Sequence, residues 1–429
     1  MSNNRKDFIA GMLTAFIMSL VVVAIVLCIK VARESGDTKA ESIRERAEQT
    51  LKGSDKQDDT AGETKEKVDE SSIVRDKDVQ KKIERIEKII HKNYIDAVDK
   101  DTIAEGVYDG LMESIDDAYA DYYSPEEWIS MQQSTQGIYY GIGAYLQKDQ
   151  TLLYPRITSV IEGTPAEEAG LKADDIIEKV DDEDVYDLDL SDVVTKIKGE
   201  EGTSVHLTIV RDLEGKREVK EFDVVRRKVE TPTVTWEMKE NDIAYIKISE
   251  FDIVTVDQFT EALAEAKGKR MKGLILDLRS NPGGSLASVV DIARLLLPKG
   301  RIVYTEDKYG NQNSYDCEGT HEIDVPMAVL VNGYSASASE ILAGAIKDYN
   351  KGTLIGTTTY GKGIVQQIFT LEDGSAIKLT VSHYYTPNGN DIHKVGIEPD
   401  IVLEFDADAY EKDETDNQLD EAMKILTEG

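Results

Sequence analysis

Two stretches late in the chain carry residues that suit nucleophilic chemistry. Three serines, Ser335, Ser337 and Ser339, alternate with alanines between a predicted buried strand at residues 325–331 and an apolar helical pattern at 341–346. Small residues at a strand-to-helix junction allow close approach of other backbone and leave peptide N–H groups at the helix start free to face a ligand. A serine at such a junction can act as a nucleophile when a base lies nearby.

A candidate base follows at Lys362, which stands between Gly361 and Gly363 and precedes a strand pattern at 364–369. A lysine without neighbouring side chains, flanked by apolar strands, is well placed to be desolvated, and burial lowers a lysine pKa because it disfavours the charged form. The neutral amine can then accept the proton of a serine hydroxyl. Serine–lysine pairs are a known variant of the catalytic triad, so this spacing is consistent with acyl transfer.

These stretches match two known motifs only in part, the phosphate loop of nucleotide-binding proteins and the nucleophile elbow of hydrolases. The phosphate-loop pattern is satisfied from Gly356 to Lys362, but Gly363 stands where Ser or Thr is required, and a strand pattern follows instead of a helix. The segment from Gly333 to Ser337 nearly matches the nucleophile elbow G-x-S-x-G but lacks its second glycine. A Ser/Ala-rich helix start that only packs tightly is the remaining alternative, which the spacing alone leaves open.

Three longer motifs help to decide between a catalytic serine and a helix start that only packs tightly. VNGYSASASEILAGAIKD, GTTTYGKGIVQQ and LILDLRSNPGGS resemble the active-site region of the carboxy-terminal processing proteases, which are serine peptidases with a PDZ domain inserted ahead of the catalytic core. The resemblance covers roughly residues 76–403. It implies that Ser337 is the nucleophile, Lys362 the general base and Gln366 the glutamine that hydrogen-bonds this lysine. Since side chains alternate along a strand, Lys362 and Gln366 share one face, which allows that contact.

A glycine turn upstream supplies the other expected part of the site. Gly283 and Gly284 follow a largely apolar strand at 271–278 and precede a helix at 286–297, so their N–H groups are unhindered. The resemblance implies that the N–H groups of Gly284 and Ala338 form an oxyanion hole, in which each donor is worth about 3–4 kcal/mol. A turn required only for packing is the alternative. Three charged residues beside this site are predicted to be structural ion-pair partners and not catalytic: Asp277, Arg279 and Glu340.

Residues 134–225 resemble a PDZ domain inserted before the core. GTPAEEAGLKADDII at 163–177 follows a glycine-containing turn at the expected distance. The resemblance implies that the backbone N–H groups of this turn hold a peptide's C-terminal carboxylate while the peptide adds a strand to the sheet. Glycine is needed there because a side chain would block close approach. The predicted peptide-binding residues are Gly141, Ile142, Gly143 and Ala144.

The N-terminal residues predict attachment to a membrane. Residues 8–29 carry no charge, and at about 1.5 Å per residue they are long enough to cross a ~30 Å hydrocarbon core as a helix. A cleaved signal peptide is the alternative, but its apolar part spans only about 7–15 residues. We therefore expect a single-pass, uncleaved anchor within residues 1–33, with the catalytic part in an extracytoplasmic, bacterial location. Residues 34–75 are polar and acidic and predict a linker.

Composition narrows the classes of partner. The chain has 83 acidic and 50 basic residues and a formal net charge of −33, which argues against nucleic acid and anionic lipid headgroups. The two cysteines, Cys28 and Cys317, are not expected to pair, because one lies in the apolar N-terminal run. The five histidines show no zinc-ligand spacing, so we expect neither a metal nor another cofactor.

The predicted fold class is α/β (α+β) and multidomain, with a ββα-type catalytic core. Its parts are an N-terminal transmembrane anchor at 1–33, a linker at 34–75, a helical N-terminal region at 76–133, a PDZ domain at 134–225, a serine peptidase core at 226–405 and an acidic C-terminal tail at 406–429. The resemblance implies that the helices at 76–133 help to form a homodimer, and simple packing onto the core is the alternative.

The expected function is that of a serine endopeptidase that recognises substrate C-termini through its PDZ domain and cleaves extracytoplasmic proteins. The rival is a catalytically silent PDZ scaffold that binds protein C-termini. The joint presence of Ser337, Lys362 and Gln366 disfavours it, since a scaffold has no use for a buried lysine. A hydrolase of small esters would share the oxyanion hole but would leave the PDZ domain unexplained.

Overall fold

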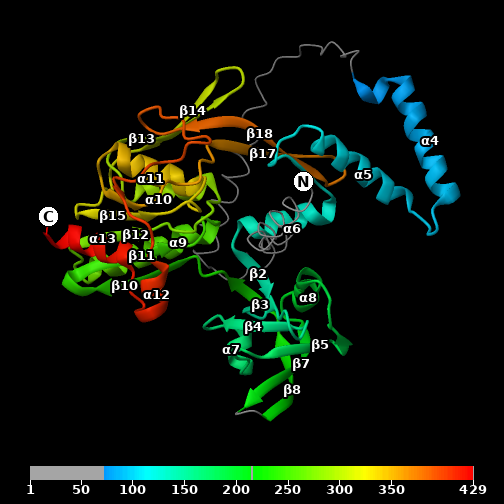
Figure 1. The fold of residues 1–429 in the computed structure, drawn as a ribbon, viewed down its shortest axis with the longest axis horizontal. Coiled ribbons are helices and arrows are strands. Elements are labelled where there is room, and N and C mark those ends of the chain that lie inside the picture. The colour runs from blue at the N-terminus through cyan, green and yellow to red at the C-terminus, as the bar shows by residue number, and fades with distance from the viewer. Residues whose placement is uncertain (1–71, 214–215, 429) are drawn as a thin grey trace, which may run out of the picture. The chain divides into compact units, whose positions relative to one another are not determined.

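The computed structural model describes residues 72–213 and 216–428 (Figure 1). The predicted anchor at 1–33 and the linker up to residue 71 lie outside these described residues. Within the described part, no helix combines the length and the hydropathy needed to cross a membrane. The described chain forms two compact units: one contains Ile129–Ile364 and residues 383–428, and the other contains residues 72–128 and Val365–Ser382.

The smaller unit contains two of the helices predicted in the N-terminal region. The elements of this part of the chain are η1 Ile73–Arg75, α4 Lys77–Asn93, α5 Lys100–Glu113, β1 Asp121–Tyr123 and α6 Pro125–Thr135, with β17 Ile364–Thr370 and β18 Ala376–Tyr385 contributed from far downstream. Asp76 caps α4 by accepting the N–H groups of Asp78 and Val79. Strand β1 pairs antiparallel with β18, with Asp121 opposite Lys378. This short strand was not predicted from the sequence, because it depends on a partner that is remote in sequence.

The region predicted to be a PDZ domain contains its own sheet, of order β3-β4-β5-β7-β8, with β6 added beside β5. Its elements are β3 Ala144–Lys148, β4 Pro155–Val160, α7 Pro165–Ala169, β5 Ile176–Val180, β6 Glu183–Asp184, α8 Leu190–Ile197, β7 Ser204–Leu213 and β8 Lys216–Val225. Alternate residues of these strands form a separate apolar core that includes Ile157, Ile177 and Leu207. In this sheet β3 is an edge strand.

Two short strands lead into and out of this region. β2 Ile138–Gly141 precedes it, β9 Arg227–Glu230 follows it, and the two pair antiparallel. The backbone N–H of Thr231 donates to the carbonyl of Gly137, which extends the pairing by one step beyond Ile138 and Glu230. We call β2, β9, Gly137 and Thr231 the hinge ribbon.

The peptidase region is built on a six-stranded sheet of order β10-β11-β12-β15-β16-β19, in which β10 is antiparallel and the other strands are parallel. The strands are β10 Val234–Lys239, β11 Ile243–Ile248, β12 Gly273–Asp277, β15 Met327–Val331, β16 Thr353–Gly356 and β19 Ile401–Val402. β12 and β15 are buried along their whole length, as their continuous apolar runs predicted. Because neighbouring parallel strands end at the same edge, the loops after β12 and β15 meet there.

Helices fill out the peptidase region. They are α9 Ile253–Gly268, α10 Leu286–Arg294, α11 Ala338–Asp348, α12 Ala407–Asp413 and α13 Asn417–Glu428, with the short 3-10 helix η2 Glu240–Asp242. The region also contains an antiparallel hairpin, β13 Gly300–Asp307 and β14 Gln312–Cys317, that the sequence did not predict. α9 contacts β11 and α10, and α10 contacts α11 (Figure 1). In the region predicted as an acidic tail, the sequence predicts a short helix at 418–426, which is present as α13, and α12 precedes it. Ala422 of α13 is fully buried against Ala328 and Leu330 of β15.

Candidate active site

Ser337 stands at the junction between β15 and α11. Its backbone has φ 53° and ψ −112°, a conformation that costs energy for a residue with a Cβ and is found mostly at functional sites. A strained serine on a sharp strand-to-helix turn is the geometry of a nucleophile elbow. The sequence motif is incomplete because its second glycine is absent, yet the turn itself is present.

The two neighbouring serines have structural partners. Ser335 and Ser339 are fully buried, whereas Ser337 is half-buried. The Ser335 hydroxyl donates to the carbonyl of Leu278 (2.8 Å), and the Ser339 hydroxyl donates to the carbonyl of Asn281 (3.0 Å). Both bonds attach the start of α11 to the loop after β12. Of the three serines, Ser337 is therefore the one that combines exposure with a strained backbone.

The Gly283–Gly284 turn lies directly against this junction. Gly283 has φ 108°, and a Cβ there would lie 2.8 Å from the Ser337 Cβ and 3.0 Å from the Ala338 nitrogen. Gly284 has φ 136°, and a Cβ there would lie 2.5 Å from the carbonyl oxygen of Phe251. Neither position leaves room for a side chain. The structure thus brings together the two loops that were predicted to hold the oxyanion donors.

Asn281 organises this turn and was not singled out from the sequence. It is fully buried. Its side-chain amide donates to the carbonyl of Ile248 (2.9 Å), and its side-chain oxygen accepts the N–H of Gly283 (2.8 Å). Its backbone carbonyl accepts the N–H of Ala336 (3.0 Å). An Asn-Pro-Gly-Gly run is a turn signal that points to this residue, although its hydrogen-bond partners become visible only in the fold.

Glu340 connects the serine loop to the lysine loop. Its Oε2 accepts the backbone N–H groups of Ser337 (2.9 Å) and Lys362 (2.8 Å). Its Oε1 accepts the N–H of Gly361 (2.7 Å) and the hydroxyl of Thr359 (2.6 Å). Burial raises the pKa of Glu340, and these four donors act in the opposite direction.

The prediction for Glu340 needs a correction. It was expected to join a structural ion pair, but the carboxylate instead accepts four hydrogen bonds from N–H and O–H groups. The spacing from Ser337 to Glu340 is that of a capping box, S-x-x-E, which is the sequence signal for the first of these bonds. No comparable local signal links Glu340 to residues 359–362.

Lys362 is half-buried in a loop held on both sides. Gly361 has φ 87°, and its carbonyl accepts the N–H of Lys394 (2.7 Å). A Cβ at Gly363 would lie 2.6 Å from the backbone nitrogen of His393. Both glycines therefore allow a close approach of the segment at 393–394, which fixes the backbone at Lys362.

Tyr384 adds a further tie that sequence reasoning missed. Its N–H donates to the carbonyl of Gly363 (3.1 Å), and its hydroxyl donates to the carbonyl of Ser337 (3.0 Å). Gln366 lies in the smaller compact unit, where its amide donates to the hydroxyl of Thr380 (3.3 Å). The predicted bond from Gln366 to Lys362 stays a prediction.

Comparison with known proteins assigns the chain to a family. A sequence profile of peptidase family S41 matches residues 242–403, one of the PDZ domain matches 156–211, and one of the activating protease CtpB N-terminal domain matches 39–127. The carboxyl-terminal-processing protease of Synechocystis sp. is 36% identical over 325 residues, which cover 74% of this chain and 76% of that protein. The chain belongs to the carboxyl-terminal processing protease family. It is a serine-type peptidase with a PDZ domain, as predicted.

A second sequence relative supports the assignment, and one solved structure shows a more distant similarity. The carboxy-terminal processing protease CtpA of Bacillus subtilis is 35% identical over 357 residues, which cover 80% of this chain and 75% of that protein. Among solved structures, the photosystem II D1 C-terminal processing protease is 28% identical, with 75% of this chain and 86% of that chain covered and a TM-score of 0.45. The match to peptidase family S41 and the two sequence relatives disfavour the alternative of a catalytically silent PDZ scaffold.

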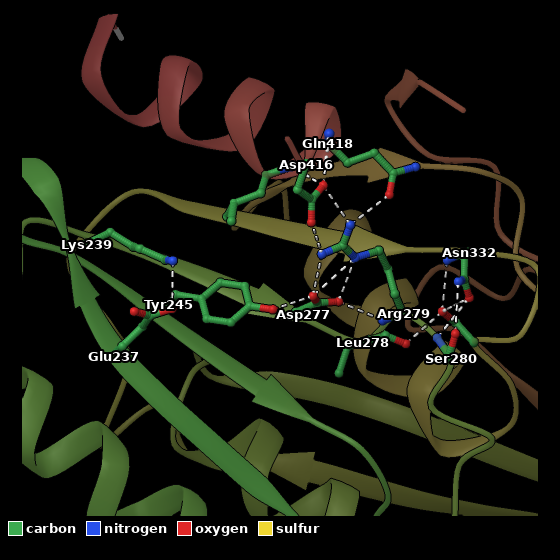
Figure 2. Close-up of polar contacts among 12 residues, drawn as sticks. Glu237, Lys239, Tyr245, Asp277, Leu278, Arg279, Ser280, Asn332, Asp416 and Gln418 are labelled. Atoms are coloured by element: carbon green, nitrogen blue, oxygen red, sulfur yellow. Dashed lines mark hydrogen bonds and ion pairs between the residues drawn. The ribbon is translucent and has the colours of Figure 1, made fainter. Parts of the chain in front are cut away.

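In this processing protease the end of β12 is tied to the C-terminal helix (Figure 2). Arg279 forms ion pairs with Asp277 (2.7 Å) and Asp416 (2.8 Å), and its guanidinium also donates to Gln418 (3.0 Å). Tyr245 donates its hydroxyl to Asp277 (2.6 Å), which is fully buried. The predicted structural ion pairing of Asp277 and Arg279 is confirmed. The contacts with Asp416, which precedes α13, and with Gln418 in α13 were not predicted, since both residues lie more than a hundred positions away.

The PDZ turn of the processing protease is also held tightly. Ile142 is buried, and its carbonyl accepts the N–H of Ala166 (2.7 Å). Gly143 has φ 86°, and a Cβ there would lie 2.3 Å from the Cβ of Thr164. The turn leads directly into edge strand β3, so an extended peptide could pair with that strand. Among the residues that the structure describes, no group of three or more His, Cys, Asp and Glu side chains is arranged to hold a metal ion.

Proposed function

We propose that this protease cleaves peptide bonds through Ser337 and Lys362. The Ser337 Oγ forms a bond to the substrate carbonyl carbon while its proton passes to the Lys362 Nζ. Collapse of the tetrahedral intermediate breaks the peptide C–N bond, and the leaving amine takes that proton. Water, deprotonated by the neutral Lys362 amine, then attacks the acyl-enzyme carbonyl; the ester C–O bond breaks, and the Ser337 Oγ takes back the proton from Lys362. The N–H groups of Gly284 and Ala338 stabilise the negative oxygen in both steps.

The observation that carries this proposal is the shared carboxylate of Glu340. It accepts N–H groups from both Ser337 and Lys362, so one buried group sets the backbone positions of the proposed nucleophile and base. The strained φ of Ser337 and the partnered state of Ser335 and Ser339 support the same choice. We further propose that Gln366, two positions beyond Ile364 on β17, orients Lys362 by a hydrogen bond.

Substrate recognition is proposed to lie in the PDZ domain at residues 134–225. The backbone N–H groups of Gly141, Ile142, Gly143 and Ala144 would receive a substrate's C-terminal carboxylate, and β3 would pair with the preceding residues. The edge position of β3 supports this binding mode. The remaining domain limits stand as proposed: a helical N-terminal region at 76–133 and a peptidase core at 226–405.

Location and assembly are proposed as well. An uncleaved helix within residues 1–33 would anchor the chain, with the peptidase in an extracytoplasmic location in a bacterium. A homodimer would form through the N-terminal helices. Ile83, Ile86 and Ile89 recur at helical spacing on α4 and are 44%, 49% and 52% exposed, an apolar stripe that a second copy would cover.

The proposal is tested by incubating the purified chain with fluorescein-labelled casein and mapping the new termini by mass spectrometry. Cleavage by the wild-type chain and none by Ser337→Ala is the expected result. Equal cleavage by both would refute the assignment of the nucleophile. Binding of peptide C-termini without any cleavage by the wild-type chain would favour a scaffold instead.

A further inference from the structure

Two carboxyl groups outside the proposed catalytic site lie in the loop between β11 and α9. Asp252 is only 2% exposed, and its Oδ2 has no hydrogen-bond partner among the residues that the structure describes. Burial, with repulsion from Glu250, raises the pKa of Asp252 to about 8. Burial also raises the pKa of Glu250 to about 7. The two carboxyl groups interact, so the pKa values describe the titration of the pair and not of either residue alone.

One side of this loop touches the hinge ribbon. Gly137 has φ 64°, and a Cβ there would lie 2.8 Å from the Asp252 Oδ2 and 2.6 Å from the Val254 Cγ2. The carbonyl of Gly137 accepts the N–H of Thr231 at 2.8 Å. Because the backbone of Gly137 packs against the Asp252 carboxyl, a displacement of this carboxyl would also displace Gly137, where the chain enters the PDZ domain.

The other side of the loop holds the glycine turn of the proposed oxyanion hole. Phe251, which stands between the two acidic residues, is fully buried. Its N–H donates to the carbonyl of Gly283 (2.8 Å), and its carbonyl accepts the N–H of Ser285 (2.7 Å). Phe251 therefore holds the residues on either side of Gly284, and it cannot move without disturbing that turn.

No cationic side chain acts on Asp252 among the described residues, and what favours its negative charge is its place as the N-cap of α9, in a capping box with Thr255. Glu250 is the charged neighbour that acts on it, and it is repulsive. The other neighbours are the backbone of Gly137, the side chain of Val254 and the hydroxyl of Thr255, which accepts the N–H of Asp252 (2.9 Å). If Asp252 ionises, its Oδ2 stays buried without a hydrogen-bond partner and without a counter-charge, which is more costly than a neutral carboxyl group.

We infer that Glu250 and Asp252 form a proton-dependent positioning pair that holds the oxyanion turn and the hinge ribbon in register with each other. When Asp252 is protonated, Phe251 keeps the Gly283–Gly284 turn against Ser337. When Asp252 ionises, the loop shifts to bring the carboxylate to water, and the contacts at Gly283 and Gly137 loosen together. The effect on cleavage rests on the proposed function, whereas the structural shift does not.

The kinetic test compares wild type with Asp252→Asn, which keeps the shape of the side chain and removes its titration. The ratio of their kcat values on fluorescein-labelled casein cancels the titration of Lys362, which both share. At about pH 6 the ratio should be near one. At about pH 9, roughly one unit above the pKa of Asp252, about a tenth of wild-type molecules keep the proton, so wild type should fall about tenfold relative to the variant. The loss should appear in kcat more than in KM.

Glu250→Gln gives a second, opposite signature. Removing the repulsive neighbour makes Asp252 easier to ionise, so the alkaline fall should move to lower pH instead of disappearing. Glu265→Gln, an exposed carboxylate on α9, is the matched control and should keep the wild-type profile. If Asp252→Asn does not fold, the direction of the Glu250→Gln shift still decides the inference.

Hydrogen exchange tests the structural shift without relying on catalysis. Peptides covering residues 136–141 and 281–286 should lose protection in wild type between about pH 7 and 9, after correction for intrinsic exchange, and keep it in Asp252→Asn. A flat kcat ratio in an active enzyme, or an equal loss of protection in both proteins, would overturn the inference. Cleavage by Ser337→Ala would instead overturn the proposed function and leave the exchange result to stand by itself.

Discussion

Ser337 and Lys362 donate their backbone N–H groups to the same oxygen of Glu340, at 2.9 and 2.8 Å. The two residues are 25 positions apart and lie on different loops, so this carboxylate oxygen links two segments that are remote in sequence. Its other oxygen holds Gly361 and Thr359. The relative placement of the proposed nucleophile and base therefore depends on a residue that takes no part in the proton transfer.

Replacing Glu340 by Gln should damage both stability and activity. The amide has one acceptor where the carboxylate has two, and its NH₂ group would face N–H and O–H donors. We expect a loss of roughly 2–4 kcal/mol in the free energy of unfolding, measured with urea, and a fall in kcat. Glu411→Gln, an exposed change on α12, is the control. Unchanged stability in Glu340→Gln would show that the four hydrogen bonds do not form in solution.

The three serines should separate by phenotype. Ser337→Ala and Lys362→Ala should each abolish cleavage while leaving the urea midpoint unchanged, and the double variant should lose no more, since the pair acts as a unit. Ser335→Ala and Ser339→Ala each remove a buried donor. They should lose about 1–2 kcal/mol of stability but still cleave while folded. Substantial cleavage by Ser337→Ala would reverse the assignment.

Removing Arg279 should be strongly destabilising, whereas weakening only its ion pair with Asp416 should cost less. Arg279→Ala leaves the fully buried Asp277 with the Tyr245 hydroxyl but without its cation, so we expect a loss of about 3–5 kcal/mol. Asp416→Asn keeps the Asp277 pair and should cost less. Chemical unfolding of both variants gives the comparison. Equal losses would mean that α13, and not Asp277, is what Arg279 mainly stabilises.

The stability that protonated Asp252 contributes should decline between about pH 4 and pH 8. Its pKa is raised in the folded chain, so the folded state binds the proton more tightly than the unfolded state. This contribution is complete below the unfolded pKa of about 4 and is lost as the pH rises through the folded value of about 8. Asp252→Asn should remove that decline. Urea midpoints of both proteins across this range are the measurement, and parallel curves would contradict it.

The PDZ turn should be sensitive to any side chain at Gly143. Its φ of 86° and the 2.3 Å approach to Thr164 mean that Gly143→Val must distort the turn. We expect it to weaken binding of a peptide with a free apolar C-terminus and to weaken the peptide's effect on reporter cleavage in parallel. With the wild-type chain, an amidated peptide should bind more weakly than the free-acid peptide and should have a smaller effect on reporter cleavage. Equal effects of the free-acid and amidated peptides would make this domain a structural lid.

The sequence by itself determined the elements whose signals are local. β12 and β15 were predicted because a strand buried on both faces reads as a continuous apolar run. The loops that follow them were predicted from glycines and small residues, whose freedom is needed wherever backbone approaches backbone. Long motifs in those loops were specific enough to point to the family, which the relatives confirm.

The tertiary structure decided which of these residues contact one another. Glu340 was predicted as an ion-pair partner because it is a charged residue beside the site, and only the fold shows that its carboxylate accepts four hydrogen bonds from N–H and O–H groups. β1 needed β18, and Arg279 needed Asp416, across separations at which no periodicity persists. Asp252 and Glu250 carry no motif at all. Their environment arises because Gly137 and Gly283 come to rest on either side of one loop, and burial and pKa depend on such packing and not on neighbouring sequence.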